Sequence, residues 1–125
     1  MPVARRRIDI EEGAAALQAW QRAAQEPAGA PVPRAVLATA VRYTLEEVTA
    51  RAPGNSVEVR VPPYGVTQCV EGPRHVRGTP PNVIECDAVT WLEMVTGLVG
   101  WAEAVGAGKV AASGLRADLS GLLPL

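Results

Sequence analysis

The stretch from Asn82 to Leu123 constrains the fold most, because its apolar spacing changes from that of a strand to that of a helix and then back. Residues 83–86 predict a short strand with Ile84 and Cys86 on one face, since alternate residues of a strand point to opposite sides. Asp87 follows and can cap a helix, because its carboxylate can accept hydrogen bonds from the free amides of the first turn. A strand that passes directly into a helix predicts a fold with both kinds of element.

The helix expected after Asp87 carries apolar residues at positions i, i+3, i+4 and i+7, which lie on one helix face. These residues are Trp91, Met94, Val95 and Leu98. Gly97 and Gly100 predict that this helix ends near Gly97. A shorter helix is expected from Trp101 to Val105, and a strand over residues 109–114 with Val110 and Ala112 on one face. The tail then carries a last apolar stripe, which consists of Leu115, Leu119, Leu122 and Leu123.

Two more strands are expected earlier in the chain. Val57, Val59 and Val61 alternate with polar residues, which predicts a strand with one face in the core and one in water. Residues 66–71 predict a second strand, paired with the first in antiparallel fashion. Its facing stays open, because either choice turns a polar side chain inward: the two sets are Val66, Gln68 and Val70 against Thr67, Cys69 and Glu71.

Two helices precede these strands. Residues 9–25 predict the first, with an acidic start that suits free amides and the helix dipole. Its expected apolar face holds Ile10, Ala14, Leu17 and Ala24, with Trp20 beside them. A Pro/Gly/Ala connector over residues 26–32 leads to a second helix that begins at Pro33. That helix is expected to bury Leu37, Val41, Leu45 and Val48, and to carry two i,i+4 ion pairs, Arg42 with Glu46 and Glu47 with Arg51.

This order of elements resembles the sterol carrier protein family, and in particular its small, single-domain actinobacterial members. The resemblance covers most of residues 34–125, and the residues that carry it best are Gly97, 107–110 (Ala-Gly-Lys-Val), Ser113-Gly114 and Asp118-Leu119. It implies an α+β fold with an antiparallel-rich sheet of roughly four to five strands and helices on one face. It also implies a cavity between sheet and helices that binds fatty acyl chains, sterols or similar lipids. We therefore expect an N-terminal tail, an extra helical arm and a connector over residues 1–32, and a sterol-carrier-like domain over residues 33–125.

Composition excludes several classes of protein. The hydrophobic content of 48% indicates a globular chain, and the formal net charge of −1 creates no field that favours nucleic acid or an anionic membrane. Charges and glycines interrupt every apolar run well before about 18 residues, so we expect no integral membrane segment. The N-terminus, with Arg5 to Arg7, lacks the apolar stretch of a signal peptide, which makes a cytoplasmic location the expectation.

Residues that carry out bond chemistry are sparse. Cys69 and Cys86 are expected to be buried thiols rather than a disulfide, because the cytosol is reducing, and their spacing is not that of a metal site. The serines lack the surroundings of an activated nucleophile, and no glycine-rich phosphate loop occurs. We therefore expect no catalytic residue, no metal and no cofactor, and a protein that is not an enzyme.

The loop from Gly72 to Pro81 is the most site-like polar stretch, since it holds Arg74, His75 and Arg77. Together these side chains could hold a phosphate or carboxylate head group through charge-assisted hydrogen bonds. The alternative is a solvated polar loop without a ligand.

A set of apolar residues near the C-terminus is the other candidate site. These side chains could line a cavity between helices and sheet, or they could be ordinary core, since a small chain needs much of its apolar inventory to fold. The residues are Trp91, Met94, Leu98, Trp101, Leu119, Leu122 and Leu123. The first functional hypothesis is non-enzymatic binding of a lipid or another apolar small molecule. The second is an accessory or protein-interaction module that keeps the fold but has a filled core.

Overall fold

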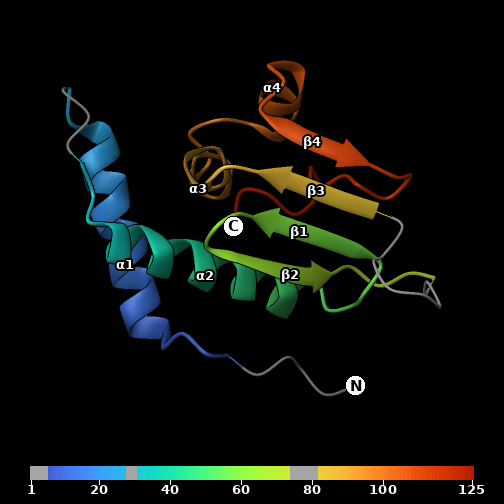
Figure 1. The fold of residues 1–125 in the computed structure, drawn as a ribbon, viewed down its shortest axis with the longest axis horizontal. Coiled ribbons are helices and arrows are strands. Elements are labelled where there is room, and N and C mark those ends of the chain that lie inside the picture. The colour runs from blue at the N-terminus through green and yellow to red at the C-terminus, as the bar shows by residue number, and fades with distance from the viewer. Residues whose placement is uncertain (1–5, 28–30, 74–81) are drawn as a thin grey trace.

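A central pair of parallel strands forms the middle of the sheet (Figure 1). In the computed structural model, which describes residues 6–27, 31–73 and 82–125, four strands lie in the order β2-β1-β3-β4. They are β1 (Val57–Val61), β2 (Gly65–Cys69), β3 (Asn82–Cys86) and β4 (Val110–Ser113). The outer strands β2 and β4 pair in antiparallel fashion with β1 and β3. The antiparallel-rich sheet is therefore confirmed, and the parallel β1–β3 pair is a feature that the spacing of apolar residues did not predict.

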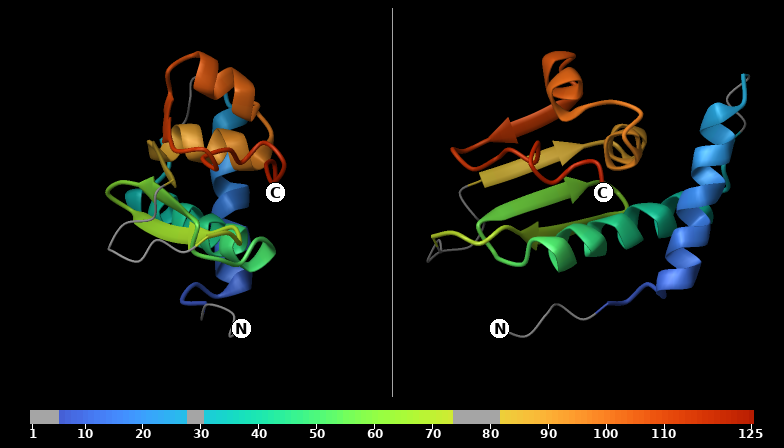
Figure 2. Two further views of the ribbon diagram at one scale, coloured as in Figure 1. Left: turned by 90° about the vertical axis from the view of Figure 1, so that its right-hand side faces the viewer. Right: turned by 180° about the vertical axis from the view of Figure 1, so that it is seen from behind.

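The helices are α1 (Ile10–Gln25), α2 (Arg34–Arg51), α3 (Ala88–Thr96) and α4 (Trp101–Gly106). Their apolar residues join those of one sheet face in a single core, while the opposite face carries the ion pair between Arg60 and Glu58. Figure 2 shows that α1 crosses one end of α2 and extends beyond the sheet. The expected α+β fold, with helices packed on one face and an additional N-terminal helix, is confirmed.

Local signals placed the ends of α3 correctly. The Asp87 carboxylate accepts a 2.8 Å hydrogen bond from the Thr90 amide, which satisfies one of the free donors of the first turn. Gly97 ends the helix in the left-handed region at φ +82°, a conformation that glycine adopts without steric cost. At α1, the Asp9 carboxylate accepts from the Glu12 amide at 3.1 Å.

A pair of hydrogen-bonded threonines lies where β2 turns its side chains toward the core. Thr67 and Cys69 lie on the core side of the sheet, in register with Val59 and Val57 of β1. The Thr67 hydroxyl lies 2.5 Å from the Thr49 hydroxyl of α2, which bonds the Gln68 carbonyl at 2.8 Å. The polar group that turns inward is thus a threonine with a partner, so the interior carries no unsatisfied Gln68 amide.

The apolar face expected for α1 was partly wrong. Ile10 is 54% exposed, and the residues that α1 buries are Gly13, Ala16 and Trp20. The physical reason is the close approach of Tyr43 from α2: a Cβ atom at Gly13 would lie 2.3 Å from the Tyr43 ring. Glycine allows this approach, and the helix face that packs on α2 is therefore the one that carries Gly13 and not the one that carries Ile10.

One of the two ion pairs expected along α2 does not form. Arg51 does contact Glu47, at 3.4 Å, as the i,i+4 spacing predicted. Arg42 instead donates from Nε to the Tyr64 carbonyl at 2.8 Å, and Glu46 accepts from backbone amides near the N-terminus. Hydrogen bonds to groups distant in sequence therefore take the place of the weak i,i+4 ion pair between Arg42 and Glu46.

Candidate functional site

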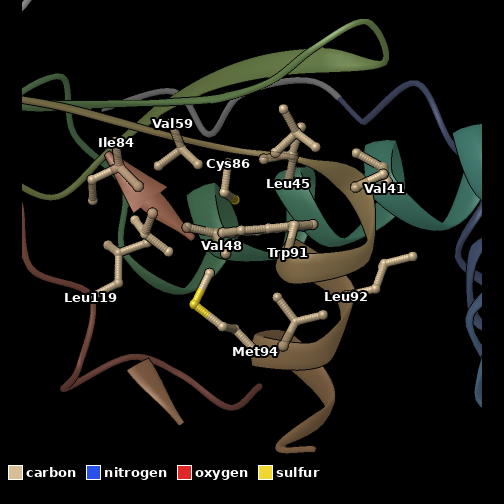
Figure 3. Close-up of a cluster of buried hydrophobic side chains, with 14 of the residues drawn as sticks. Val41, Leu45, Val48, Val59, Ile84, Cys86, Trp91, Leu92, Met94 and Leu119 are labelled. Atoms are coloured by element: carbon tan, nitrogen blue, oxygen red, sulfur yellow. The ribbon is translucent and has the colours of Figure 1, made fainter. Parts of the chain in front are cut away.

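The seven apolar residues proposed as a ligand lining lie in three different environments. Trp91 is 0% exposed and both Met94 and Leu119 are 1% exposed, so these three belong to the packed interior. Figure 3 shows them pointing into one cluster with residues of α2 and the sheet. Trp101, Leu122 and Leu123 are half-buried at the margin of this core, whereas Leu98 is 56% exposed. Trp91, Met94 and Leu119 are thus packed like ordinary core residues.

The polar half of the predicted site is the loop with Arg74, His75 and Arg77. These three residues lie outside the described residues, and their role stays a prediction. Within the described parts of the chain, no group of three or more His, Cys, Asp or Glu side chains could hold a metal ion. None of the helices described there is long and apolar enough to cross a membrane.

An open apolar groove lies between α1 and α3. It has a volume of about 440 Å³, and we call it the α1–α3 groove. One wall consists of Trp20, Ala23, Ala24 and Val32, and the other consists of Val89, Glu93, Leu98 and Val99. Val89 and Leu98 are 51% and 56% exposed, which is high for large apolar side chains. Among the described residues that line it, Glu93 is the one with a charge.

Of the residues that the sequence predicted as a ligand lining, Leu98 is the one that lies in this groove. Leu98 was predicted on the apolar face of the helix that follows Asp87; in the structure it comes after Gly97, where α3 ends, and lines the groove. Val89 lies off that face, and Trp20 and Val32 belong to the N-terminal segments. Their convergence depends on how α1 packs against the rest of the fold, and a local apolar spacing carries no information on that.

A second groove lies between the N-terminal segment, α2 and β2, and we call it the α2–β2 groove. Its volume is about 450 Å³, and its lining mixes apolar and charged residues. The lining residues are Arg7, Ile8, Arg42, Leu45, Glu46, Thr49, Tyr64, Gly65, Val66 and Thr67. The Glu46 carboxylate holds the N-terminal segment in place by accepting from the Arg7 and Ile8 amides at 2.8 and 3.1 Å.

The two cysteines are buried free thiols, as expected. Burial raises the pKa of the Cys69 thiol to about 11. Burial also raises the pKa of the Cys86 thiol to about 12, and the negative charges of Asp87 and Glu85 add to that effect. Both thiols are therefore protonated at neutral pH, when a reactive cysteine would have to be a thiolate.

Comparison with protein families decides the identity of the domain. A model described as the bacterial SCP ortholog matches residues 33–125. The chain belongs to this family. The match confirms the resemblance to sterol carrier proteins, and it covers every described element from α2 to β4. A search of curated proteins found no match.

One wall of the α1–α3 groove lies within the residues that the family model matches, and the other lies before them. Val89, Glu93, Leu98 and Val99 lie within the matched SCP region, whereas Trp20, Ala23 and Ala24 of α1 lie before it. The groove is therefore formed where an additional helix packs beside the SCP region. This position makes α1 part of the candidate site.

Proposed function

We propose that this SCP family member binds an apolar or amphipathic small molecule in the α1–α3 groove and performs no bond chemistry on it. Family membership supports this class of function. The groove volume of about 440 Å³ falls within the range of roughly 300–1,000 Å³ that is common for small-molecule sites. The proposed partner is thus a lipid or another apolar small molecule.

The observation that carries the proposal is the exposure of Val89 and Leu98 opposite Trp20. A ligand that covers these side chains removes apolar surface from water, which contributes about 25 cal/mol for each Å² buried. Of the residues predicted to line a site, Leu98 is the one that we place in contact with this ligand. The Glu93 carboxylate on the same wall disfavours an anionic group in its neighbourhood.

A cavity between the sheet and the helices would require a different structure of the core. Trp91, Met94 and Leu119 would have to move apart, since each is almost completely buried. An empty space among them would cost stability in proportion to its volume, and only a tightly bound ligand would offset that cost. The groove needs no such rearrangement, which is why we favour it.

Native mass spectrometry and NMR titration test this proposal. We expect purified protein to carry a bound apolar mass that delipidation removes. We also expect decanol to shift the backbone amide signals of Val89, Glu93 and Leu98. Leu98→Ser should weaken decanol binding, whereas the matched variant Leu115→Ser should not, because Leu115 is fully exposed outside this groove. Equal binding by the two variants would overturn the placement.

The second candidate function is an accessory or protein-interaction module with a filled core. The complete burial of Trp91, Met94 and Leu119 favours it, because the interior leaves no room for a ligand at those residues. No bound mass together with unchanged amide signals in decanol would support this module and would reject small-molecule binding.

A further inference from the structure

The α2–β2 groove combines apolar side chains with two arginines that have no acidic partner among the described residues. Arg7 and Arg42 both line it, together with the apolar side chains of Ile8 and Leu45 and with the half-exposed Tyr64. The ion pairs among the described residues are Arg6–Glu47, Arg51–Glu47 and Arg60–Glu58, and neither groove arginine belongs to them. The residues outside the described ranges include no Asp or Glu, so they supply no carboxylate either.

The acidic residue that lines the groove, Glu46, already accepts hydrogen bonds from the protein backbone. Both oxygens of Glu46 accept from backbone amides, those of Arg7 at 2.8 Å and Ile8 at 3.1 Å. These bonds hold the segment that carries the Arg7 side chain against α2. The Nε atom of Arg42 donates to the Tyr64 carbonyl at 2.8 Å, which fixes that guanidinium and leaves its two terminal nitrogens for another acceptor.

We propose that the α2–β2 groove binds an amphiphile with an anionic head group, a phosphate or a carboxylate. The head lies between Arg7 and Arg42, because a guanidinium group matches the oxygens of these anions in a forked geometry. The apolar part lies against Ile8, Leu45 and Tyr64, which line the same groove as the two arginines. This site is separate from the α1–α3 groove and does not depend on the function proposed for it.

Hydrogen bonds within the protein hold parts of the groove lining in place without a ligand. Glu46 holds the backbone at Arg7 in place, and the Tyr64 carbonyl holds the Arg42 guanidinium. Fixing these groups in advance lowers the entropy cost of binding. The hydrogen bond between Thr49 and Thr67, which both line the groove, also ties α2 to β2, so the distance between these two elements is maintained.

The test is an NMR titration with three probes that separate head from tail: hexyl phosphate, inorganic phosphate and hexanol. Hexyl phosphate should shift the amide signals of Ile8, Gly65 and Thr67 most strongly. Inorganic phosphate should shift the same signals at a higher concentration, because it lacks the apolar contacts. Hexanol should leave them unchanged, because it lacks the anion.

Charge variants complete the test. The double variant Arg7→Gln/Arg42→Gln should weaken hexyl phosphate binding by about tenfold or more, as expected when charge-assisted hydrogen bonds are lost. Arg7→Lys/Arg42→Lys should bind with intermediate strength, since it keeps the charge without the fork. Arg60→Gln is the control, because Arg60 is paired with Glu58 on the outer sheet face.

Three results would overturn the proposal. Hexanol could bind as tightly as hexyl phosphate, the shifted signals could lie only at Val89 and Leu98 in the other groove, or the Gln double variant could bind like the parent chain. If inorganic phosphate binds as tightly as hexyl phosphate, the apolar half of the proposal is wrong.

Discussion

The indole nitrogen of Trp91 donates a 2.8 Å hydrogen bond to the hydroxyl oxygen of Thr44, 47 positions earlier in the chain. The Thr44 hydroxyl in turn bonds the Ala40 carbonyl at 2.8 Å, so the polar atoms of both side chains have partners. Both residues are 0% exposed. This hydrogen bond fixes the position of α3 on α2 in the middle of an otherwise apolar core.

Replacing Thr44 by valine tests this link. Thr44→Val keeps the shape of the side chain but removes the acceptor, so the buried Trp91 N–H is left without a partner. We expect the free energy of unfolding to fall by about 1–3 kcal/mol, as measured by urea denaturation. Thr44→Ser keeps the hydroxyl and should lose less. A valine variant that is as stable as the parent chain would show that the hydrogen bond does not stabilise the fold.

Adding one methyl group at Gly13 should loosen the packing of α1 on α2. The new Cβ atom of Gly13→Ala would lie 2.3 Å from the Tyr43 ring, and the two helices would have to separate. We expect a loss of about 1–3 kcal/mol in thermal or urea unfolding. The matched variant is Gly106→Ala in α4, where nothing lies within 4 Å of the new atom. Gly106→Ala should stabilise the chain by about 0.4–1 kcal/mol. If both variants change the free energy of unfolding by the same amount, the close contact between Gly13 and Tyr43 is contradicted.

Removing the Glu46 carboxylate should release the N-terminal segment from α2. Glu46→Ala deprives the Arg7 and Ile8 amides of their acceptor. Hydrogen exchange at the Ile8 amide should therefore become about tenfold faster or more, as followed by NMR. Glu46→Gln keeps one neutral acceptor oxygen and should give an intermediate rate. Unchanged exchange in the alanine variant would mean that other contacts hold the segment.

The buried thiols predict a loss of stability in alkaline solution. The folded-state pKa values of Cys69 and Cys86, about 11 and about 12, lie above the value of about 8.5 for an unfolded cysteine. The unfolded chain therefore releases protons first, and the stabilising effect of the protonated thiols is full below about pH 8.5 and lost as the pH rises towards the folded values.

The slope of this dependence can be measured thiol by thiol. Between about pH 9 and 10, the free energy of unfolding should fall by about 1 kcal/mol per pH unit for each thiol, with about 1.4 kcal/mol as the upper limit. Urea denaturation in the presence of a reductant gives this slope. Cys69→Ala should remove about half of the contribution of the two thiols. A variant that keeps the full slope would assign the alkaline effect to other titrating groups.

Short-range signals in the sequence predicted the elements well. The Asp87 cap, the end of α3 at Gly97 and the alternation of Val57, Val59 and Val61 all agree with the structure. Such features depend on a few neighbouring residues, whose hydrogen bonds and burial follow from local spacing. The family resemblance, which depends on the order of the same elements, was confirmed for the same reason.

The candidate site was predicted less completely. The α3 stripe correctly identified Trp91 and Met94 as residues of one helix face, but an apolar face can be either core or ligand lining. Their complete burial places them in the core, while Leu98 lies in the α1–α3 groove. Arg42 and Glu46 were expected as a pair, and their roles in the α2–β2 groove arise from partners that are distant in sequence.

The amino-acid order by itself determined where strands and helices begin and end, and which family the domain belongs to. Tertiary structure alone decided the parallel β1–β3 pairing, the inward turn of Thr67 and the two grooves. The physical reason is the range of the interactions. A cap or an alternating strand is completed within a few residues, whereas a groove is made of side chains from separate elements whose meeting depends on the packing of the entire chain.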